Sequence, residues 1–380
     1  MTFRKSIFWL HLAAGLTAGT AIAILCLTGT ALAFEKEIIA YAERDARRIA
    51  SPAPDAARLP LADLLTRVRT AHPSARPDGM VLHNHPLAAV AFTAGRATTF
   101  YADPYTGEIR QPASISARDT LKLLEDWHRV LALAGDQRPI GKAITGACNL
   151  AFLILPVSGL YLWWPRKWRT KGLHRSIWFI RRPADAKARD WNWHNVTGLW
   201  TAPVLIVLTL TALPISYRWA GQLLSTITGT PPPPPTAANP ASAAKLTPPT
   251  PEAKLLSSEA LIAVAQKQFP TWQTLTYRAG TTQPATVAIR TADSWPRTAT
   301  TTLSLNPFTG EILKRAGYAE LNAAQQLRSW TRYLHTGEAV GWLGQLLAAI
   351  ASLGGCVLVY TGFALLWHRW RRWRSTSLTP

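Results

Sequence analysis

The chain has 380 residues, with 41 Lys and Arg against 21 Asp and Glu and a net charge of +20. So large a basic excess can indicate nucleic-acid binding, but its distribution argues against a nucleic-acid partner. Basic residues gather in short segments such as 166–193, with nine Lys and Arg and two Asp, whereas 35–139 is nearly balanced, with fourteen basic and thirteen acidic residues. This alternation is the positive-inside pattern of membrane proteins, and it predicts cytoplasmic N- and C-termini.

Four apolar blocks separate these polar segments. They predict transmembrane helices at residues 6–34, 140–165, 194–218 and 340–367, because each is long enough to cross the hydrocarbon core. Pro156 and Pro203 lie inside two of the blocks, where kinked membrane helices tolerate them. The first block has an alternative interpretation as a signal peptide, since Ala-Leu-Ala at 31–33 follows the apolar run, but that run is longer than the usual signal core.

The three cysteines, Cys26, Cys148 and Cys356, all lie within apolar blocks. There is no C-x-x-C pair and no C-x-x-C-H, so the sequence predicts neither a disulfide framework nor covalent c-type haem. Buried thiols that pack as small apolar side chains are the favoured interpretation.

The sequence repeats at a spacing near 190 residues. Asp-Pro-Tyr-Thr-Gly-Glu-Ile at 103–109 matches Asn-Pro-Phe-Thr-Gly-Glu-Ile at 306–312, and each predicts a β-hairpin preceded by a helix, at 61–71 and 258–269. The fold expected is an all-α bundle of four transmembrane helices with two periplasmic α+β modules, related by an internal parallel duplication. Outside the membrane helices, the expected segments are module 1 (35–120), an amphipathic helix (121–139), a basic cytoplasmic loop (166–193), a Pro-rich linker (219–251), module 2 (252–326), a second amphipathic helix (327–339) and a basic cytoplasmic tail (368–380).

Four of the nine histidines occupy positions related by this repeat. His11 and His194 lie toward the cytoplasmic side of the first and third blocks, and His128 and His335 precede the second and fourth blocks on the outer side. A histidine in or beside the hydrocarbon region is usually functional, and imidazole is a common axial ligand of haem iron. We therefore expect two pairs, His11 with His194 and His128 with His335, each holding one haem b. The alternative is four unrelated interfacial histidines.

Three arginines near the outer histidines, Arg129, Arg328 and Arg332, could pair with haem propionates, since guanidinium matches carboxylate geometry. Ordinary interfacial snorkelling is the equally weighted alternative. The roles of the remaining polar-segment histidines are not fixed by the sequence: His83 and His85 form an H-x-H pattern that is a weak metal signal, and the others considered are His174 in the basic loop and His368 at the end of the fourth block.

Several motifs together resemble the PepSY-associated transmembrane family, which includes iron-regulated membrane proteins and ferric-siderophore reductases. They are Phe-Trp-Leu-His-Leu at 8–12, Ser-Gly-Leu-Tyr-Leu-Trp-Trp-Pro at 158–165, Trp193-His194, Leu-His-Thr-Gly-Glu at 334–338, and the two Pro-[Tyr/Phe]-Thr-Gly-Glu motifs. The resemblance implies two periplasmic PepSY modules on a bacterial inner-membrane protein. It also implies di-haem electron transfer that reduces the iron of a ferric siderophore or another Fe(III) chelate at the outer face.

The electron donor implied is cytoplasmic or a membrane quinol. Two other functions stay open. One is a non-enzymatic membrane protein whose modules bind peptides or regulate a protease. The other is a metal-chelate transporter, which the scarcity of ionisable residues in the apolar blocks argues against.

Overall fold

The computed structural model describes residues 2–53, 55–94, 98–111, 116–164, 178–183, 185–230, 246–250 and 252–377. The chain divides into two compact units. The helical unit comprises Met1–Glu35, Thr120–Leu224 and Leu327–Pro380, and the sheet unit comprises Lys36–Asp119 and Ser225–Gln326. Each unit is therefore built from both halves of the sequence.

Four helices in the described chain are long and apolar enough to cross a membrane: α1 (Phe3–Leu32), α6 (Arg138–Trp163), α8 (Ala186–Ser216) and α12 (Trp342–Ser377). They support the prediction of a multi-pass membrane protein. The helix α8 begins eight residues before the expected third span, because Asp185 caps it by accepting a hydrogen bond from the Ala188 N–H at 2.8 Å. His194 therefore lies in the third turn of a longer helix rather than at its start.

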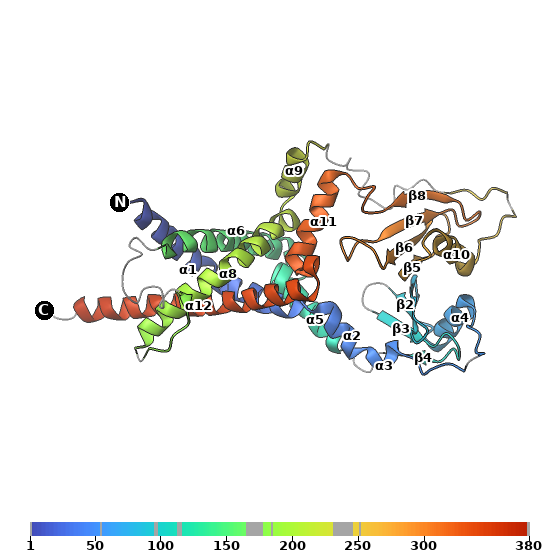
Figure 1. Cartoon of the computed structure of the whole chain (residues 1–380), viewed down its shortest axis with the longest axis horizontal. Helices are drawn as coiled ribbons and strands as arrows, with labels where there is room; N and C mark the ends of the chain where they lie inside the picture. The colour runs from blue at the N-terminus through green and yellow to red at the C-terminus, as the bar shows by residue number, and fades with distance from the viewer. Residues whose placement is uncertain are drawn as a thin grey trace. The chain divides into compact units, whose positions relative to one another are not determined.

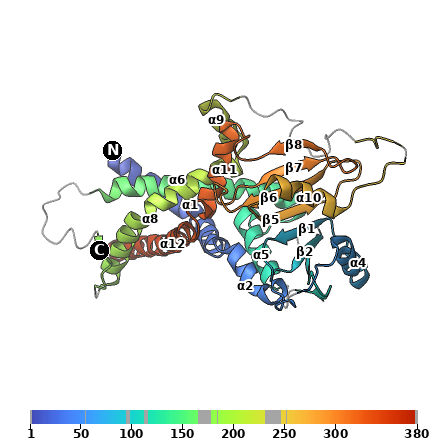
Figure 2. The ribbon, with the colours of Figure 1, turned by 45° about the vertical axis from the view of Figure 1, so that its right-hand side comes forward.

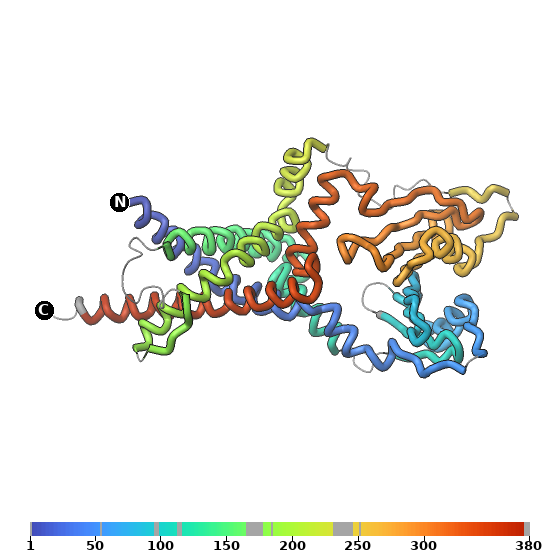
Figure 3. The backbone as a smooth tube through the Cα atoms, in the orientation of Figure 1, coloured from blue at the N-terminus to red at the C-terminus, as the bar shows by residue number. Residues whose placement is uncertain are grey.

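The four long helices pack as a ring in which α1 contacts α6 and α12, and α8 contacts the same two helices. As a result, α1 and α8 face each other across the bundle. Buried small and apolar side chains fill its middle, among them Ile22, Cys26 and Leu205, with Cys148 and Cys356 packed against them. The start of α1 and the end of α12 lie at the same end of the bundle (Figure 3).

Two shorter helices of this unit each lead into a long helix through a tight turn. In the first half, α5 (Ser116–Val130) is followed by η1 (Gly135–Gln137) and α6. The carbonyl oxygen of Val130 approaches α6 so closely that a Cβ on Gly141 would lie 2.1 Å from it. Only glycine fits there, so this contact fixes where α5 ends relative to α6.

The second half of the chain has the same close contact between a helix glycine and a backbone carbonyl. There α11 (Ala323–Thr336) is followed by η4 (Glu338–Val340) and α12, and Gly337 turns the chain with φ +77°. A Cβ on Gly344 would lie 2.2 Å from the carbonyl oxygen of Gly337. Val130 and Gly337 each stand two residues after a histidine, so both glycine contacts set the position of His128 and His335.

The sheet unit contains one antiparallel sheet of eight strands. Its strands are β1 (Gly79–His83), β2 (Val90–Ala94), β3 (Thr98–Ala102), β4 (Ile109–Arg110), β5 (Trp272–Arg278), β6 (Ala285–Thr291), β7 (Thr301–Leu305) and β8 (Ile312–Ala316). Their order is β4-β3-β2-β1-β5-β6-β7-β8 (Figures 1 and 2). The sequence predicts two separate modules, whereas in the structure their first strands, β1 and β5, pair directly and make one sheet.

One face of this sheet carries the core of the unit. Helices α4 (Leu61–Ala71) and α10 (Ser258–Gln268) pack on that face, and the buried residues include Leu64, Phe92, Leu261, Leu275 and Val287. Strand residues alternate between this apolar face and a more polar one, as the period of two requires. The remaining described helices are α2 (Glu35–Ala42), α3 (Arg44–Arg47) and α9 (Arg218–Ile227), of which α3 covers part of the polar face beside β2 and β3.

The two predicted hairpins are confirmed, since β3 pairs with β4 and β7 pairs with β8. Asp103 Oδ1 accepts hydrogen bonds from the backbone N–H groups of Tyr105 and Thr106, and Asn306 Oδ1 accepts one from Phe308. These are Asx turns, which explains why Asp and Asn interchange at this position. The same order of helix and four strands thus occurs in both parts of the sheet unit, as the proposed duplication requires.

A buried carboxylate ties the start of the sheet unit to its strands. Glu43, only 1% exposed, accepts hydrogen bonds from Arg47, from the Tyr101 hydroxyl at 2.6 Å and from Arg118. Burial opposes ionisation, but these hydrogen bonds outweigh it and lower the pKa of Glu43. Burial and the same carboxylate raise the pKa of Tyr101 to about 12. The cluster joins α3, β3 and α5.

Candidate functional site: two histidine pairs in the helical unit

The structure brings His11 and His194 together across the bundle. His11 lies on α1 and His194 on α8, and their ring centroids are 6.3 Å apart, with the ring planes at 82°. One of the other two long helices holds each ring. His11 Nδ1 is hydrogen-bonded to the Ser158 hydroxyl of α6 at 2.8 Å, and His194 Nδ1 to the Thr361 hydroxyl of α12 at 2.9 Å. All four long helices therefore contribute to this inner pair.

The hydroxyl groups determine which ring nitrogen carries the proton. Ser158 donates its hydroxyl hydrogen to the Ile154 carbonyl at 2.6 Å, and Thr361 donates its own to Val357 at 2.7 Å. Each hydroxyl oxygen must then accept from the imidazole, so Nδ1 is the protonated nitrogen. The Nε2 lone pair of each histidine is left as a donor for a metal, which is the arrangement found in metal-ligating histidines.

The outer pair is built in the same way on the short helices. His128 on α5 and His335 on α11 have ring centroids 6.3 Å apart, with planes at 51°. His128 Nδ1 bonds the Thr28 hydroxyl of α1 at 2.9 Å, and His335 Nδ1 donates to the Leu208 carbonyl of α8 at 2.9 Å. Thr28 donates its hydroxyl hydrogen to Ile24, so both outer rings also present Nε2.

Burial keeps both outer imidazoles neutral. It lowers the pKa of His335, and together with the neighbouring His335 it lowers the pKa of His128 to about 4. A neutral imidazole is the form that binds a metal, because a protonated ring has no free lone pair. Both rings of the outer pair are therefore in the ligand form at neutral pH.

The two pairs lie at different depths in the bundle. His11 and Thr28 are both on α1, seventeen residues apart, which at about 1.5 Å per residue places the outer pair roughly 25 Å along the axis from the inner pair. A hydrocarbon core is about 30 Å thick. One pair therefore lies toward each side of a membrane that the bundle would cross.

The centroid distance of 6.3 Å in each pair matches that of two imidazoles that would share one metal ion. Two metal–nitrogen bonds of about 2 Å, with about 1 Å from each nitrogen to its ring centre, separate the centroids by about 6 Å. The described residues contain no group of three or more His, Cys, Asp or Glu able to hold a metal ion. A bare zinc ion, which takes four ligands, is a poor match, whereas haem iron brings its equatorial ligands with it. The donor set fits b-type haem.

Glycines lie beside three of the rings. A Cβ on Gly159 would lie 3.4 Å from Cε1 of His11 and one on Gly362 would lie 3.7 Å from Cε1 of His194, which are ordinary contacts, whereas one on Gly29 would lie 3.2 Å from Cε1 of His128, which is tight. Gly159 and Gly362 directly follow the two hydroxyl residues of the inner pair. The outer ring of His128 is therefore the one whose neighbouring glycine leaves little space for a side chain.

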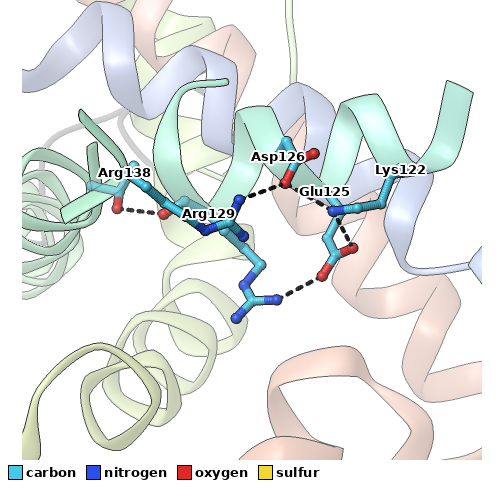
Figure 4. A network of polar contacts seen from close by, with 6 residues as sticks. Lys122, Glu125, Asp126, Arg129 and Arg138 are labelled. Atoms are coloured by element: carbon cyan, nitrogen blue, oxygen red, sulfur yellow. Dashed lines mark hydrogen bonds and ion pairs between the residues drawn. The ribbon is translucent and has the colours of Figure 1, made fainter. Parts of the chain in front are cut away.

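One of the three arginines expected near the outer pair already has a carboxylate partner. Arg129 donates to Glu125 at 2.7 Å, within a network in which Lys122 and Arg138 contact Asp126 (Figure 4). Arg129 is about half exposed, and Glu125 already neutralises it. Arg332 and Arg328 lie on α11. A role of these three arginines in binding haem propionates remains a prediction.

Another histidine has a partner that the sequence did not indicate. Nε2 of His368 lies 3.1 Å from Oδ2 of Asp190, a buried carboxylate that also accepts from Arg189. This contact joins α12 to α8, one helical turn from His194. His174 lies outside the described residues. His85 accepts a hydrogen bond from the Leu87 N–H and caps a turn.

Sequence reasoning missed the residues that hold the histidine rings. A usable signal was present, because Ser158 and Thr361 open matching segments of the second and fourth blocks, and Thr28 follows His11 at the spacing at which Thr211 follows His194. Read as isolated polar residues in apolar helices, they indicate helix contacts. Read together with the histidines, they indicate hydrogen-bond partners for buried rings.

Comparison with known proteins supports the predicted family. No curated protein matches the chain. A family model described as the PepSY-associated TM region matches residues 8–369, which include most of each long helix, both histidine pairs and the whole sheet unit. The chain belongs to the PepSY-associated transmembrane family.

Proposed function

We propose that the protein is a di-haem b-type electron-transfer protein of the bacterial inner membrane, which reduces the iron of a ferric siderophore or another Fe(III) chelate on the periplasmic side. His11 and His194 would hold one haem b, and His128 and His335 the other. The electrons would come from a cytoplasmic donor or from quinol. The activity expected is that of a ferric-siderophore reductase.

The observation that carries this proposal is the likeness of the two pairs. Each has ring centroids 6.3 Å apart, and each of the four Nδ1 atoms is occupied by an acceptor from another helix. Four unrelated interfacial histidines have no reason to meet in pairs with the same ring nitrogen free. A hydrogen bond from the other ring nitrogen to a nearby acceptor orients a ligand imidazole and increases its basicity.

When bound, haem supplies a reversible one-electron Fe(III)/Fe(II) couple, and the protein tunes its potential through the axial ligands and the burial around it. The chain's own residues hold the rings and keep water away. Between the two pairs lie packed apolar side chains, including Ile22, Phe152 and Leu205. A dry interior of low dielectric separates the sites and insulates them from both aqueous sides.

The orientation proposed rests on charge. The start of α1 and the end of α12 lie at the same end of the bundle, and the tail beyond Trp367 carries four Arg and no acid. The positive-inside rule assigns this end to the cytoplasm. The inner pair, His11 with His194, is the one nearer that end, and the outer pair then lies toward the periplasm.

The decisive experiment is haem quantitation with an absorption spectrum on the purified full chain. Wild type is expected to bind two haems per chain. His11→Ala and His194→Ala are each expected to lose the same haem, and His128→Ala and His335→Ala the other. His85→Ala, at an exposed turn, is the matched control and should retain both.

Other outcomes distinguish the alternative functions. A folded wild-type protein without a Soret band would exclude the redox function and favour a peptide-binding or protease-regulating membrane protein. Uptake of a metal chelate into proteoliposomes without reduction of its iron would favour a transporter. Retention of both haems in all four alanine variants would overturn the assignment of the ligands.

A further inference from the structure

A row of three polar side chains crosses the middle of the sheet unit. His83 on β1 is paired in register with Thr274 on β5, and Thr274 is paired with Arg290 on β6. Directly paired residues project from the same face of a sheet, so all three share the face opposite to the α4 and α10 core. The row spans the seam at which the two modules join.

Two polar contacts link the members of the row. Arg290 Nη2 donates to the Thr274 hydroxyl at 3.3 Å, and that hydroxyl lies 3.3 Å from Nδ1 of His83. The hydroxyl oxygen has two lone pairs, so it can accept from Arg290 and either donate to His83 Nδ1 or accept from it. With either tautomer of His83, the Arg290 guanidinium supplies N–H donors at one end of the row.

One of these donors is buried without a partner. Within the described part of the chain, Nε of Arg290 is inaccessible to solvent and makes no hydrogen bond. An unsatisfied buried donor is costly, and a charged one more so, which makes it a mark of a missing partner. A β-bulge interrupts the pairing of β5 and β6 between Trp272 and Thr274, directly beside the row. Bulges of this kind redirect side chains next to binding sites.

The charges around the row favour an anion. Partial desolvation and, after it, the charges of Arg47 and Arg290 lower the pKa of His83. The nearby carboxylate, Glu43, is already bound by Arg47, Tyr101 and Arg118. It cannot serve as the partner of Arg290 without giving up those bonds. The Arg290 guanidinium thus brings positive charge and N–H donors to the row, and among the described residues its Nε has no hydrogen-bond partner.

We propose that His83, Thr274 and Arg290 form a binding site for an anionic oxygen ligand, specifically a carboxylate of a small iron chelate of the polycarboxylate class. The row lies on interior strands, since β1 and β5 are in the middle of the sheet order, so a peptide cannot bind there by adding a strand. That favours a small anion. The iron in this proposal rests on the proposed function, whereas the binding of the anion does not.

The test is calorimetric titration of the full chain, in nanodiscs of zwitterionic lipid, with citrate and with ferric citrate. Both are expected to bind to wild type. Arg290→Gln is expected to weaken both by about ten-fold or more, because it removes a charge-assisted donor. Arg315→Gln is the matched control, since Arg315 lies on β8 of the same sheet and pairs with Glu320 at 3.0 Å. Its affinity should equal that of wild type.

A second variant keeps the test valid if Arg290→Gln does not fold. His83 is exposed, so His83→Gln should leave folding intact. In wild type, a bound anion raises the lowered pKa of His83 and draws a proton onto it, so the affinity for fully ionised citrate is expected to rise as the pH falls through the range in which histidine titrates, about 7 to 5.5. His83→Gln should remove most of this dependence. The same affinity in Arg290→Gln and Arg315→Gln, or no pH dependence to remove in wild type, would overturn the site.

The two proposals fail separately. Citrate binding that depends on Arg290 in a protein without haem would leave the anion site standing and refute the redox function. Two bound haems in a protein that does not bind citrate would do the reverse. A ferric trihydroxamate without carboxylates is the discriminating ligand, because the site predicts that it binds no more weakly to Arg290→Gln than to wild type.

Discussion

Replacement of Gly344 by alanine should disable the outer histidine pair alone. A Cβ at this position would lie 2.2 Å from the carbonyl oxygen of Gly337, two residues after His335. Real Cβ atoms do not approach other atoms within 3.0 Å, so the backbone must separate by at least 0.8 Å. The obstacle is backbone rather than a flexible side chain, so the start of α12 or the end of α11 has to move.

A backbone displacement of this size is larger than the positional error that a metal-ligand site tolerates. A ligand constellation must be held within about 0.5 Å of its working geometry. Both rings of the outer pair sit on short helices whose ends are fixed by such glycine contacts, so Gly344→Ala should move His335 relative to His128. The expected result is loss of one haem of two, with the spectrum of the other unchanged. Gly141→Ala, with its Cβ 2.1 Å from the Val130 carbonyl oxygen, should give the same result through His128.

The control is alanine at helical glycines that have room. Cβ atoms on Gly15 and Gly198 would meet their nearest neighbours at 3.8 and 3.5 Å, which are ordinary contacts, and both residues lie one turn from an inner histidine. These variants should bind two haems. Haem content and thermal unfolding are measured on all four proteins. Two haems in Gly344→Ala with an unchanged outer spectrum would refute the argument that the glycine contacts position the outer pair.

Two further predictions concern hydrogen bonds. Thr28→Val removes the hydroxyl that accepts from His128, so it should weaken haem binding at the outer pair by about 10- to 100-fold. Thr211→Val, at the matching position of the second half, should not weaken it, because His335 donates to a backbone carbonyl. Equal haem retention in the two variants would contradict this expectation. Glu43→Gln should destabilise the sheet unit by about 2 kcal/mol, seen as faster hydrogen exchange in its strands, while Glu108→Gln, at an exposed pair, should change it little. Because folding lowers the pKa of Glu43, its contribution to the free energy of unfolding is present above the ordinary carboxyl pKa of about 4 and is lost at lower pH. The stability of Glu43→Gln should therefore lack this acid sensitivity. The same acid transition in both proteins would contradict the assignment.

Much of the architecture follows from local pattern. Apolar length predicts the long helices, because a helix that crosses a membrane must satisfy its own backbone and needs about 20 apolar residues. The two hairpins follow from Asx-Pro and glycine, since Gly107 and Gly310 both take φ near +75°. These features depend on residues that are close in sequence, which is why the sequence alone indicates them.

The features that the sequence did not indicate depend on distant contacts. Nothing local in β1 or β5 marks them as partners, because pairing of two strands about 190 residues apart is decided by how the modules pack. The same holds for Asp190 and His368, which meet only because α8 and α12 are neighbours in the ring. The pairing of His11 with His194 could be proposed only because the internal repeat supplied the long-range information.

The two halves are alike in order but unequal in the support they give to their histidines. Both inner rings donate to a hydroxyl that is itself bonded to a helix carbonyl, so the inner pair is symmetric. In the outer pair, His128 donates to the Thr28 hydroxyl, whereas His335 donates directly to the Leu208 carbonyl, which also accepts from Thr211. A backbone carbonyl cannot be altered by a change of side chain, so variation in the sequence can tune the basicity of His128 more freely than that of His335. If both pairs hold the same cofactor, this difference in acceptors is a means by which one chain gives its two sites different potentials.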